Sequence, residues 1–315
     1  MRPTVSIIMP SYNHGRFIHE AIKSVLNQTF DDLELIIIDD GSTDNSRDII
    51  QRFAELDSRV IPLFHEKNMG IARTVNDGLD AAKGEFVAFT QSDDVWISNK
   101  LETQLEILAR DEDLVVWSEG EIVDAEGNST GQTFTEMHNA TNRKKSGYIF
   151  YELLKGNFVY GSSRILKRKN IGKLRFDESL RYLNDYKFEV ELAFRYDYYF
   201  IKRPLAKYRI HGKNTILADK PGWLLDTIRV NRYFLDHYGS RISRELRTLL
   251  YYKIAAAYGQ LGNKKVATQY LYKIFSTCPA SPYWSMLLVI LCTKEDSVIR
   301  QVFRRLYKMV SKWGW

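Results

Sequence analysis

The chain has 315 residues, of which 44% are hydrophobic and 27% are charged, a composition that excludes a disordered protein. Residues 221–315 hold 15 basic and 5 acidic side chains, a net charge of +10, whereas residues 1–220 carry a net charge of −4. Because the excess of basic charge is confined to the C-terminal part, we expect no nucleic acid partner; a membrane surface or an acidic partner suits it better. The two cysteines, Cys278 and Cys292, are too few for a disulfide framework and fit a reducing compartment.

The N-terminus leads directly into an apolar, strand-like run, which leaves no room for a signal peptide. The sequence also contains no run of about 18 apolar residues, the length that predicts a membrane-spanning helix. We therefore expect a cytoplasmic protein.

Strand and helix signals alternate along the first hundred residues. Short apolar runs predict strands at residues 5–9, 33–38, 60–64 and 86–89. Apolar residues at helical spacing predict helices from about residue 17, at about 44–54 and at 71–82. Because the strand runs have few polar interruptions, we expect a mostly parallel central sheet flanked by helices, an α/β fold. Right-handed crossovers then bring the loops that follow the strands to one edge, namely residues 10–15, 39–42, 67–70 and 91–96.

The rest of the chain is less regular in its middle and helical at its end. Residues 125–128 read as a turn, and residues 136–146 as a polar loop. Helical spacing begins at Trp223, and residues 255–279 resemble a single tetratricopeptide-type helix pair, which cannot form a solenoid alone. We expect two domains, residues 1–220 and an all-α region at residues 221–315.

The last predicted helix, in residues 297–315, is amphipathic. It has an apolar stripe, a face rich in lysine and arginine, and two terminal tryptophans, Trp313 and Trp315. Two interpretations stay open, a helix that covers the core and a helix that lies on an anionic membrane surface. The second would make the protein peripheral on the inner face of the cell membrane.

Four motifs follow the predicted strands. In chain order they are Pro10-Ser11-Tyr12-Asn13, Asp39-Asp40-Gly41-Ser42, Asn68-Met69-Gly70-Ile71-Ala72-Arg73 and Ser92-Asp93-Asp94. This series closely resembles the family 2 glycosyltransferases of the GT-A fold over residues 4–97, and more weakly as far as about residue 215. The resemblance implies a nucleoside-diphosphate sugar donor, a divalent metal (Mg²⁺ or Mn²⁺) and transfer of the sugar with inversion.

The first two motifs suit a nucleotide. Pro10 ends the first strand, and the loop with Ser11 and Tyr12 can meet the donor. A carboxylate at the end of the second strand can accept a hydrogen bond from the imide N–H of uracil or thymine. The resemblance assigns this role to Asp40, with Asp39 next. A helix N-cap is the alternative role for these carboxylates.

The third motif adds a positively charged side chain. Arg73 offers a planar fork of donors for phosphate or base edges, and the turn at Asn68 directs the start of its helix toward the site. The alternative is an ordinary surface arginine, and a role for Asn76 is less certain. At the fourth motif, Gln91 and Ser92 are expected beside the donor, where an amide can bond a ribose hydroxyl.

The fourth motif also suits a metal. In the family the metal motif is commonly Asp-X-Asp, but Gln91 stands in its first position here. The resemblance therefore leaves Asp93 as the main expected ligand, with Asp94 next. His211, in a segment like the family's Tyr-Arg-X-His, is expected to bind the metal or the diphosphate. One or two carboxylates together with substrate phosphates are normal ligands for Mg²⁺.

Inverting transfer needs a base that takes the proton of the acceptor hydroxyl. The segment around Asn184 and Asp185 resembles the family's segment ending in Glu-Asp, so we expect Asp185 to be the base. Glu189, one helical turn later, is the second candidate, and an N-cap is the alternative role for Asp185.

The acceptor is expected near Trp96, Gly161 and Ser162, because an aromatic face suits the apolar face of a sugar. Core packing is the alternative role for Trp96.

The sequence therefore predicts a metal-dependent inverting glycosyltransferase of the hexosyltransferase type. It would use a UDP- or dTDP-linked sugar and a glycan or lipid-linked glycan acceptor in cell-surface polysaccharide synthesis. Two alternatives remain, a nucleotidyltransferase and a non-catalytic module that binds nucleotide sugars or glycans. The glycine-poor first loop, with only Gly15, disfavours the nucleotidyltransferase.

Overall fold

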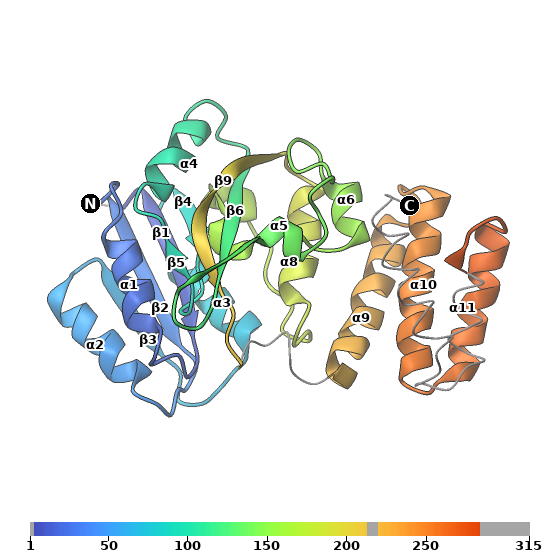
Figure 1. The fold of residues 1–315 in the computed structure, drawn as a ribbon, viewed down its shortest axis with the longest axis horizontal. Coiled ribbons are helices and arrows are strands. Elements are labelled where there is room, and N and C mark those ends of the chain that lie inside the picture. Colours follow the sequence, from blue (N-terminus) through green and yellow to red (C-terminus); the bar gives the residue numbers. More distant parts are fainter. Residues whose placement is uncertain (1–2, 213–219, 284–315) are drawn as a thin grey trace. The chain divides into compact units, whose positions relative to one another are not determined.

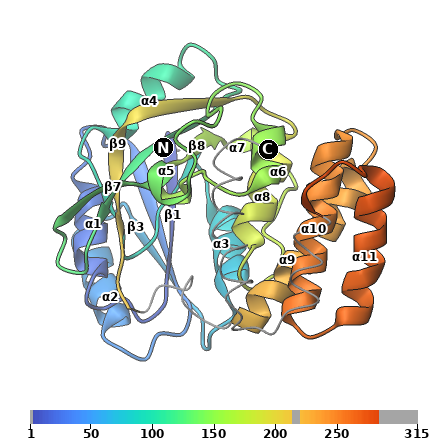
Figure 2. The same ribbon diagram turned by 45° about the vertical axis from the view of Figure 1, so that its right-hand side comes forward.

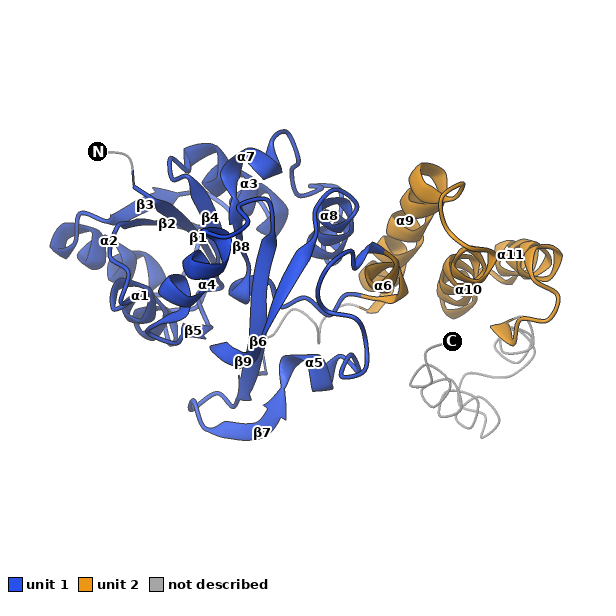
Figure 3. Ribbon diagram, turned by 90° about the horizontal axis from the view of Figure 1, so that it is seen from above, with its two compact units in different colours: residues 1–150, 157–214 blue, residues 151–156, 215–315 orange. Residues whose placement is uncertain are grey.

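The computed structural model describes residues 3–212 and 220–283 (Figure 1). It divides into two compact units (Figure 3). The first comprises Met1–Phe150 and Asn157–Asn214, and the second comprises Tyr151–Gly156 and Thr215–Trp315. The boundary between residues 220 and 221 stays a prediction, and the amphipathic helix expected at residues 297–315 lies outside the described residues.

The first unit is built on a nine-stranded sheet with the order β3-β2-β1-β4-β8-β6-β9-β5, and β7 pairs with β6. The strands are β1 (Val5–Ser11), β2 (Leu33–Asp39), β3 (Val60–Phe64), β4 (Phe86–Phe89), β5 (Val95–Trp96), β6 (Val115–Val123), β7 (Ser129–Thr133), β8 (Ile165–Lys167) and β9 (Tyr198–Arg209). The first four are parallel to one another, as predicted. The later part is mixed, because β8 runs antiparallel to both β4 and β6, whereas β6 and β9 are parallel.

Helices connect and cover these strands. They are α1 (Ile18–Leu26), α2 (Ser46–Leu56), α3 (Ile71–Ala81), α4 (Lys100–Leu108), α5 (Phe134–Met137), α7 (Arg168–Ile171), α8 (Asn184–Ala193) and the 3₁₀ helix η1 (Gly161–Ser163). The short helix α6 (Phe150–Lys155) lies at the boundary between the two units. Residues 136–146, predicted as a loop, include the end of α5, whose N-cap Thr133 and third residue Glu136 form a capping box.

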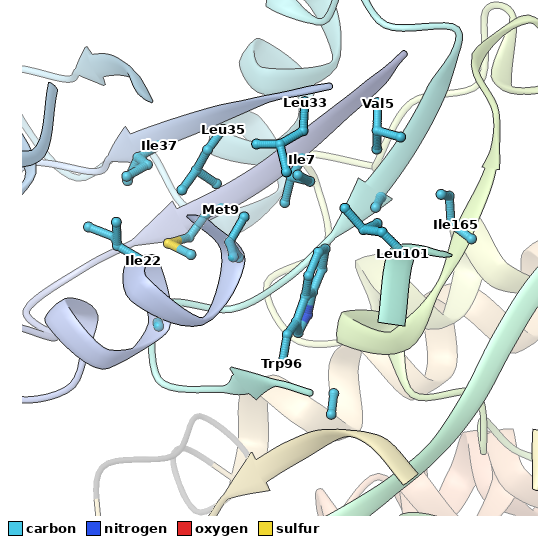
Figure 4. Close-up of a cluster of buried hydrophobic side chains, with 14 of the residues drawn as sticks. Val5, Ile7, Met9, Ile22, Leu33, Leu35, Ile37, Trp96, Leu101 and Ile165 are labelled. Atoms are coloured by element: carbon cyan, nitrogen blue, oxygen red, sulfur yellow. The ribbon is translucent and has the colours of Figure 1, made fainter. Parts of the chain in front are cut away.

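Alternate residues of the buried strands face opposite layers of helices. Ile7 and Met9 belong to a core cluster with Ile22 of α1 (Figure 4). The other face of the sheet packs against α3 so closely that a Cβ added at Gly78 would lie 2.6 Å from Ile8. The strands therefore lie between α1 and α3 (Figure 2), which is why their sequences read as continuous apolar runs.

The second unit is helical in the part that the structure describes. Its helices are α9 (Lys220–Tyr238), α10 (Arg244–Gln260) and α11 (Lys264–Thr277). Ser243 and Asn263 cap α10 and α11 with side-chain oxygens that accept backbone N–H bonds. Ile254 and Ile274 are fully buried between these helices in one cluster. Within residues 220–283 and the rest of the described chain, no helix is both long and apolar enough to cross a membrane.

The α/β fold with a helical C-terminal region is therefore confirmed. Right-handed β-α-β connections bring the ends of β1, β2, β3 and β4 to one edge of the sheet. Most of the predicted site residues lie in the loops at this edge.

Candidate functional site

Hydrogen bonds tie the four loops of this edge together. The backbone N–H of Asn13 donates to Ser42 Oγ at 2.8 Å, which joins the loops after β1 and β2. The loops after β2 and β3 touch so closely at Gly41 that a Cβ there would lie 2.6 Å from the backbone of Lys67. Gly41 has a φ of +74°, which a glycine adopts without strain. A bond of 2.7 Å between His14 and Ser92 adds the loop after β4.

Asp39 presents a carboxylate oxygen that the protein leaves without a partner. Its Oδ1 accepts a bond from the Ser42 N–H at 2.9 Å, but Oδ2 is buried and has no hydrogen-bond partner among the described residues. Ser11, its register partner on β1, has a buried Oγ in the same condition. Buried polar groups without partners are rare and costly. An N–H donor on a ligand, such as a nucleobase imide, would satisfy Asp39.

Asp40 has a different environment. Its carboxylate accepts bonds from the backbone N–H groups of Met69 (2.7 Å) and Gly70 (2.9 Å), and a third bond joins it to His65 Nδ1 (2.8 Å). These contacts hold the loop that leads into α3. Oδ1 of Asp40 has two partners and Oδ2 has one, whereas Oδ2 of Asp39 has none among the described residues. This difference favours Asp39 for the base, whereas the sequence ranked Asp40 first.

Arg73 lies on α3 beside a small open pocket. Its Nε donates to Asp77 at 3.0 Å, and its guanidinium also lies 3.9 Å from Glu178. His65 Nε2 is 3.0 Å from the same Asp77 carboxylate, so Arg73, Asp77 and His65 form a chain that ends at Asp40. The pocket, about 260 Å³ in volume, is lined by His65, Glu66, Lys67, Met69, Arg73 and Asp77. Asn68 is exposed in the loop between Lys67 and Met69.

Asn76, whose role was less certain, holds another segment in place. Its side-chain amide donates to the carbonyl oxygen of Phe176 at 2.9 Å and accepts from the Phe176 N–H at 2.8 Å. These two bonds fix the chain that leads toward α8. We therefore interpret Asn76 as a positioning residue.

Asp93 lies between two histidines. Its carboxylate is 3.0 Å from His211 Nε2 and 4.0 Å from His14 Nδ1. The three ligand atoms of His14, Asp93 and His211 all lie within 4.8 Å of one another, so the cluster fits a divalent cation. No motif in the sequence predicted a role for His14. Its place in the first loop of the expected edge was the available signal.

The ring of Phe17 supports the two histidines. It stacks on the His211 ring with centroids 4.8 Å apart and meets the His14 ring edge-on at 6.3 Å. The Arg209 guanidinium lies over the Phe17 ring, 5.3 Å from its centroid, and its Nε donates to the backbone oxygen of Asp93 at 3.0 Å. Phe17 and Arg209 are therefore supporting residues that the sequence analysis did not assign.

Asp94 does not belong to this cluster. Its carboxylate accepts bonds from Ser162 Oγ at 2.5 Å and from the Arg209 N–H at 3.2 Å. Burial raises the pKa of Asp94 to about 8, and the negative charge of Asp93 adds to the rise. The prediction that Asp94 binds the metal is therefore corrected, because its oxygens instead connect the β4 end to η1 and β9.

The remaining residues of the first and fourth motifs have mixed environments. Pro10 is buried within β1, whereas Tyr12 in the loop after it is 44% exposed. Gln91 is exposed, and Ser92 is buried against His14. Tyr12 and Gln91 are thus the members of this set that an incoming donor can reach directly.

Asp185 lies in the first turn of α8, where its Oδ1 accepts a bond from the Tyr186 N–H at 2.7 Å. The N-cap is Leu183, so Asp185 is not the cap. Desolvation by the surrounding protein raises the pKa of Asp185 to about 6, and the nearby charge of Glu189 adds to the rise. Its side chain nevertheless remains exposed, so water opposes part of this rise and an acceptor can reach the carboxylate.

Glu189 is not available as a base. It is buried, forms an ion pair with Arg164, and accepts a bond from the Tyr198 hydroxyl at 2.6 Å. The second candidate for the base is therefore wrong, since its carboxylate is already paired inside the protein.

The residues predicted to contact the acceptor also differ in whether they are buried or exposed. Trp96 is 3% exposed and points into the core cluster (Figure 4). Lys100 Nζ lies 3.8 Å from the centroid of the Trp96 ring. The expected sugar stacking on Trp96 is therefore corrected to core packing. Ser162 is buried against Asp94, whereas Gly161 is exposed and has open space where a Cβ would lie.

The sequence of the first unit decides the family. Residues 6–175 match the sequence pattern described as Glycosyl transferase family 2. This chain belongs to that family. The match covers more than half of the chain and includes the ends of β1, β2, β3 and β4.

Individual relatives agree with this membership. An uncharacterized glycosyltransferase of Haemophilus influenzae is 37% identical over 174 residues, which are 55% of this chain and 66% of that protein. The putative teichuronic acid biosynthesis glycosyltransferase TuaG of Bacillus subtilis is 45% identical over 107 residues, 34% of this chain and 42% of that protein. The matched regions thus span less than two thirds of the length of these relatives.

Solved structures share the fold at low sequence identity. TarS 1-349 of S. aureus in complex with UDP-GlcNAc has a TM-score of 0.67 and 17% identity, covering 91% of this chain and 87% of that one. The mannosyltransferase PcManGT from Pyrobaculum calidifontis, in complex with GDP-Man and Mn²⁺, has a TM-score of 0.55 and 18% identity, covering 99% of this chain and 86% of that one.

Proposed function

We propose that the protein is an inverting glycosyltransferase that moves a sugar from a nucleoside-diphosphate donor, UDP- or dTDP-linked, to a hydroxyl of a glycan or lipid-linked glycan. The observation that carries the proposal is the composition of one sheet edge. It combines a buried Asp39 oxygen with no partner among the described residues and a cluster that fits a cation around Asp93, and α8 adds an exposed carboxylate at Asp185. Base recognition, diphosphate binding and proton transfer each need one of these groups.

Donor binding would begin at Asp39. Its Oδ2 would accept the imide N–H of a uracil or thymine ring, while the exposed Tyr12 and Arg73 are placed to contact the ring or phosphates. A guanine ring also carries a ring N–H that a carboxylate can accept, so the donor panel described below, rather than Asp39 alone, separates UDP- and dTDP-linked from GDP-linked sugars.

A divalent cation, held by Asp93 and His211, would neutralise the charge that develops on the departing diphosphate. Arg209 donates to the backbone oxygen of Asp93 and Phe17 stacks on the His211 ring, so protein contacts support both proposed ligands. Asp93 is the one carboxylate in this cluster of described residues, so cation binding would depend on it.

Asp185 would accept the proton of the acceptor hydroxyl as its oxygen attacks the anomeric carbon on the face opposite the leaving group. A raised pKa suits a base that must take up a proton near neutral pH. Attack from that face inverts the anomeric configuration.

A role in cell-surface polysaccharide synthesis is supported by the similarity to TuaG, a putative teichuronic acid biosynthesis glycosyltransferase. Attachment to anionic membrane through residues 297–315 stays a proposal from sequence. Deleting these residues should lower binding to anionic liposomes, and unchanged binding would reject it.

The test of the function is sugar transfer by the purified full chain with a panel of UDP-, dTDP- and GDP-sugars, Mn²⁺ or Mg²⁺, and oligosaccharide or lipid-linked acceptors. We expect release of UDP or dTDP that depends on the acceptor, and an inverted product by NMR. Tight donor binding without turnover over the whole panel would instead favour the non-catalytic module. The nucleotidyltransferase alternative is set aside, because no observation on this edge favours it over the family's activity.

A further inference from the structure

We propose that His14 is a third protein ligand of the cation, so that the protein holds a divalent transition metal before the donor arrives. The inference deepens the proposed function and rests on it for the role of the metal. It concerns the selectivity and order of metal binding, which two ligands supplied by Asp93 and His211 alone would not determine.

The distances suit a common metal. A cation with bonds of about 2.0–2.2 Å to nitrogen and oxygen holds its ligand atoms about 3–4.4 Å apart, depending on their angle. His211 Nε2 and Asp93 Oδ2 are already 3.0 Å apart, and His14 Nδ1 is 4.0 Å from Asp93 Oδ1. All three ligand atoms lie within 4.8 Å of one another. Only small side-chain shifts are needed to surround one ion.

The backbone around His14 is held firmly. Its N–H donates to Ser46 Oγ at 3.1 Å, and the next N–H, that of Gly15, donates to Asp44 at 2.8 Å. Asn13 adopts a φ of +54°, and its side-chain oxygen accepts from the Thr43 N–H at 2.8 Å. A Cβ on Gly15 would lie 1.9 Å from the Asn45 side chain, so the loop is packed directly against the start of α2. These contacts therefore hold the His14 backbone in place in the absence of the nucleotide-sugar donor.

The two imidazoles are also packed against each other. The rings of His14 and His211 meet at 87° with centroids 5.7 Å apart, and Phe17 contacts both. His211 is 8% exposed and Asp93 is 9% exposed, whereas His14 is only partly buried. The open side of the cluster is thus the His14 side. Diphosphate oxygens and water can complete the coordination from there.

Two imidazoles and one carboxylate select among cations. Mg²⁺ prefers an all-oxygen shell, while imidazole nitrogen suits later transition metals, and affinity for such sites rises from Mn²⁺ to Co²⁺. We therefore expect the donor-free protein to bind Mn²⁺ more tightly than Mg²⁺, and Co²⁺ more tightly than Mn²⁺. A site with Asp93 as its main ligand and the diphosphate as its partner would discriminate less and would need the donor.

The alternative role for His14 is to orient Ser92, whose Oγ lies 2.7 Å from the same Nδ1. A metal at Nδ1 would replace this hydrogen bond. The two roles separate in the Ser92→Ala variant. It removes the hydrogen bond but leaves the imidazole, so metal binding survives if His14 is a ligand.

The experiment titrates Mn²⁺ into the full chain without donor and follows free Mn²⁺ by its EPR signal, with Mg²⁺ and Co²⁺ as competitors. His14→Ala is expected to weaken Mn²⁺ binding at least about tenfold and to narrow the preference for Co²⁺ over Mg²⁺. Ser92→Ala should keep the wild-type affinity. The matched control is His19→Ala, a histidine of α1 whose ring packs against Phe53 outside the cluster. His14→Asn, which keeps a polar partner for Ser92, replaces His14→Ala if that variant does not fold.

Wild-type affinity in both His14 variants would overturn the inference, as would equal loss in Ser92→Ala and His14→Ala. Absence of Mn²⁺ binding by the donor-free wild type would overturn it too. Each of these results leaves the proposed function intact if sugar transfer is observed. Conversely, a protein that binds Mn²⁺ through His14 but shows neither donor binding nor transfer would retain the metal site and lose the proposed function.

Discussion

The ends of β2 and β4 each carry two adjacent aspartates, and in both pairs the two carboxylates have different surroundings. At β2, Asp39 keeps an oxygen with no partner in the part of the chain that the structure describes, while Asp40 is bonded to the loop that begins α3. At β4, Asp93 lies in the histidine cluster, while Asp94 is bonded to Ser162 and to the backbone of Arg209. In each pair the first aspartate faces the candidate site and the second stabilises the loops that form it.

The two pairs leave their strands differently. Asp39 is the last residue of β2 and Asp40 follows it, so their side chains point to opposite sides, whereas Asp93 and Asp94 lie in the turn between β4 and β5. Two charges so close together would also repel, and pairing one of them with N–H and O–H donors lowers that cost. A doubled aspartate at a strand end therefore indicates one ligand-binding group and one supporting group.

The largest expected effect of a mutation is at Asp185, because we expect this residue to act on the reacting hydroxyl itself. Asp185→Asn keeps the oxygen that accepts from the Tyr186 N–H but cannot take up a proton. We expect kcat to fall by roughly 10²–10⁴ with little change in donor affinity. Single-turnover transfer and a donor titration measure the two quantities. Full activity in this variant would eliminate Asp185 as the base.

Mutations of the two aspartates that follow β4 should differ strongly in their effect on Mn²⁺ affinity. Asp93→Asn removes the charge from the histidine cluster, and we expect Mn²⁺ affinity to fall by about 100-fold or more. Asp94→Asn can still accept from the Arg209 N–H and donate to Ser162 Oγ, so Mn²⁺ affinity should change by less than about threefold. Equal losses in the two variants would contradict the division of roles.

Mutations of the two aspartates at the end of β2 should differ in their effect on nucleotide affinity. Asp39→Asn keeps the oxygen for the Ser42 N–H but loses the charged acceptor that we assign to the base imide. Hydrogen bonds to charged groups contribute about 1.5–3 kcal/mol, so UDP affinity should fall roughly 10- to 100-fold. Calorimetric titration of UDP at fixed Mn²⁺ measures this change. An unaltered affinity would exclude Asp39 from base recognition.

The pH dependence tests the assignment of Asp185. A general base must be ionised, and the pKa of Asp185 is raised to about 6, chiefly by desolvation. The value of kcat/KM should therefore rise as the pH increases through about 6 and level off above it, with at most about a tenfold drop from pH 7 to pH 5. A donor-binding titration over the same range serves as the control, since loss of donor affinity would mimic this limb.

The smallest expected effect concerns Asp40. Asp40→Ala leaves the N–H groups of Met69 and Gly70 without their acceptor, which should destabilise the fold by about 1–3 kcal/mol. Thermal or urea unfolding measures this change. Asp40→Asn, which keeps an amide oxygen for the Met69 or Gly70 N–H, is the matched control and should lose less stability. A stable Asp40→Ala protein that has lost UDP binding would restore Asp40 as the base-binding residue.

The sequence predicted the first part of the fold well. The strands at residues 60–64 and 86–89 and the helix at residues 71–82 differ from β3, β4 and α3 by at most one residue. Apolar runs and helical spacing are local signals, so they can be read without the tertiary structure. The edge that gathers the loops follows from the same topology.

The different roles of the site residues could be predicted from the sequence less well than the fold. Asp94 is bonded to Ser162, which lies 68 residues away in the chain, and Asp93 meets His211 across 118 residues. His14 carried no motif of its own, and only the approach of the loop after β4 gives it a role. Trp96 and Glu189 were predicted near the chemistry because their burial depends on β9, α4 and Arg164, which no local pattern reveals.

The most direct test of the account is a calorimetric titration of UDP into the wild type and Asp93→Asn, each with and without Mn²⁺. We predict that UDP binds the wild type at least about tenfold more tightly with Mn²⁺, and that Asp93→Asn abolishes this difference. Equal UDP affinity in all four titrations would contradict a cation-assisted nucleotide site at this edge of the sheet.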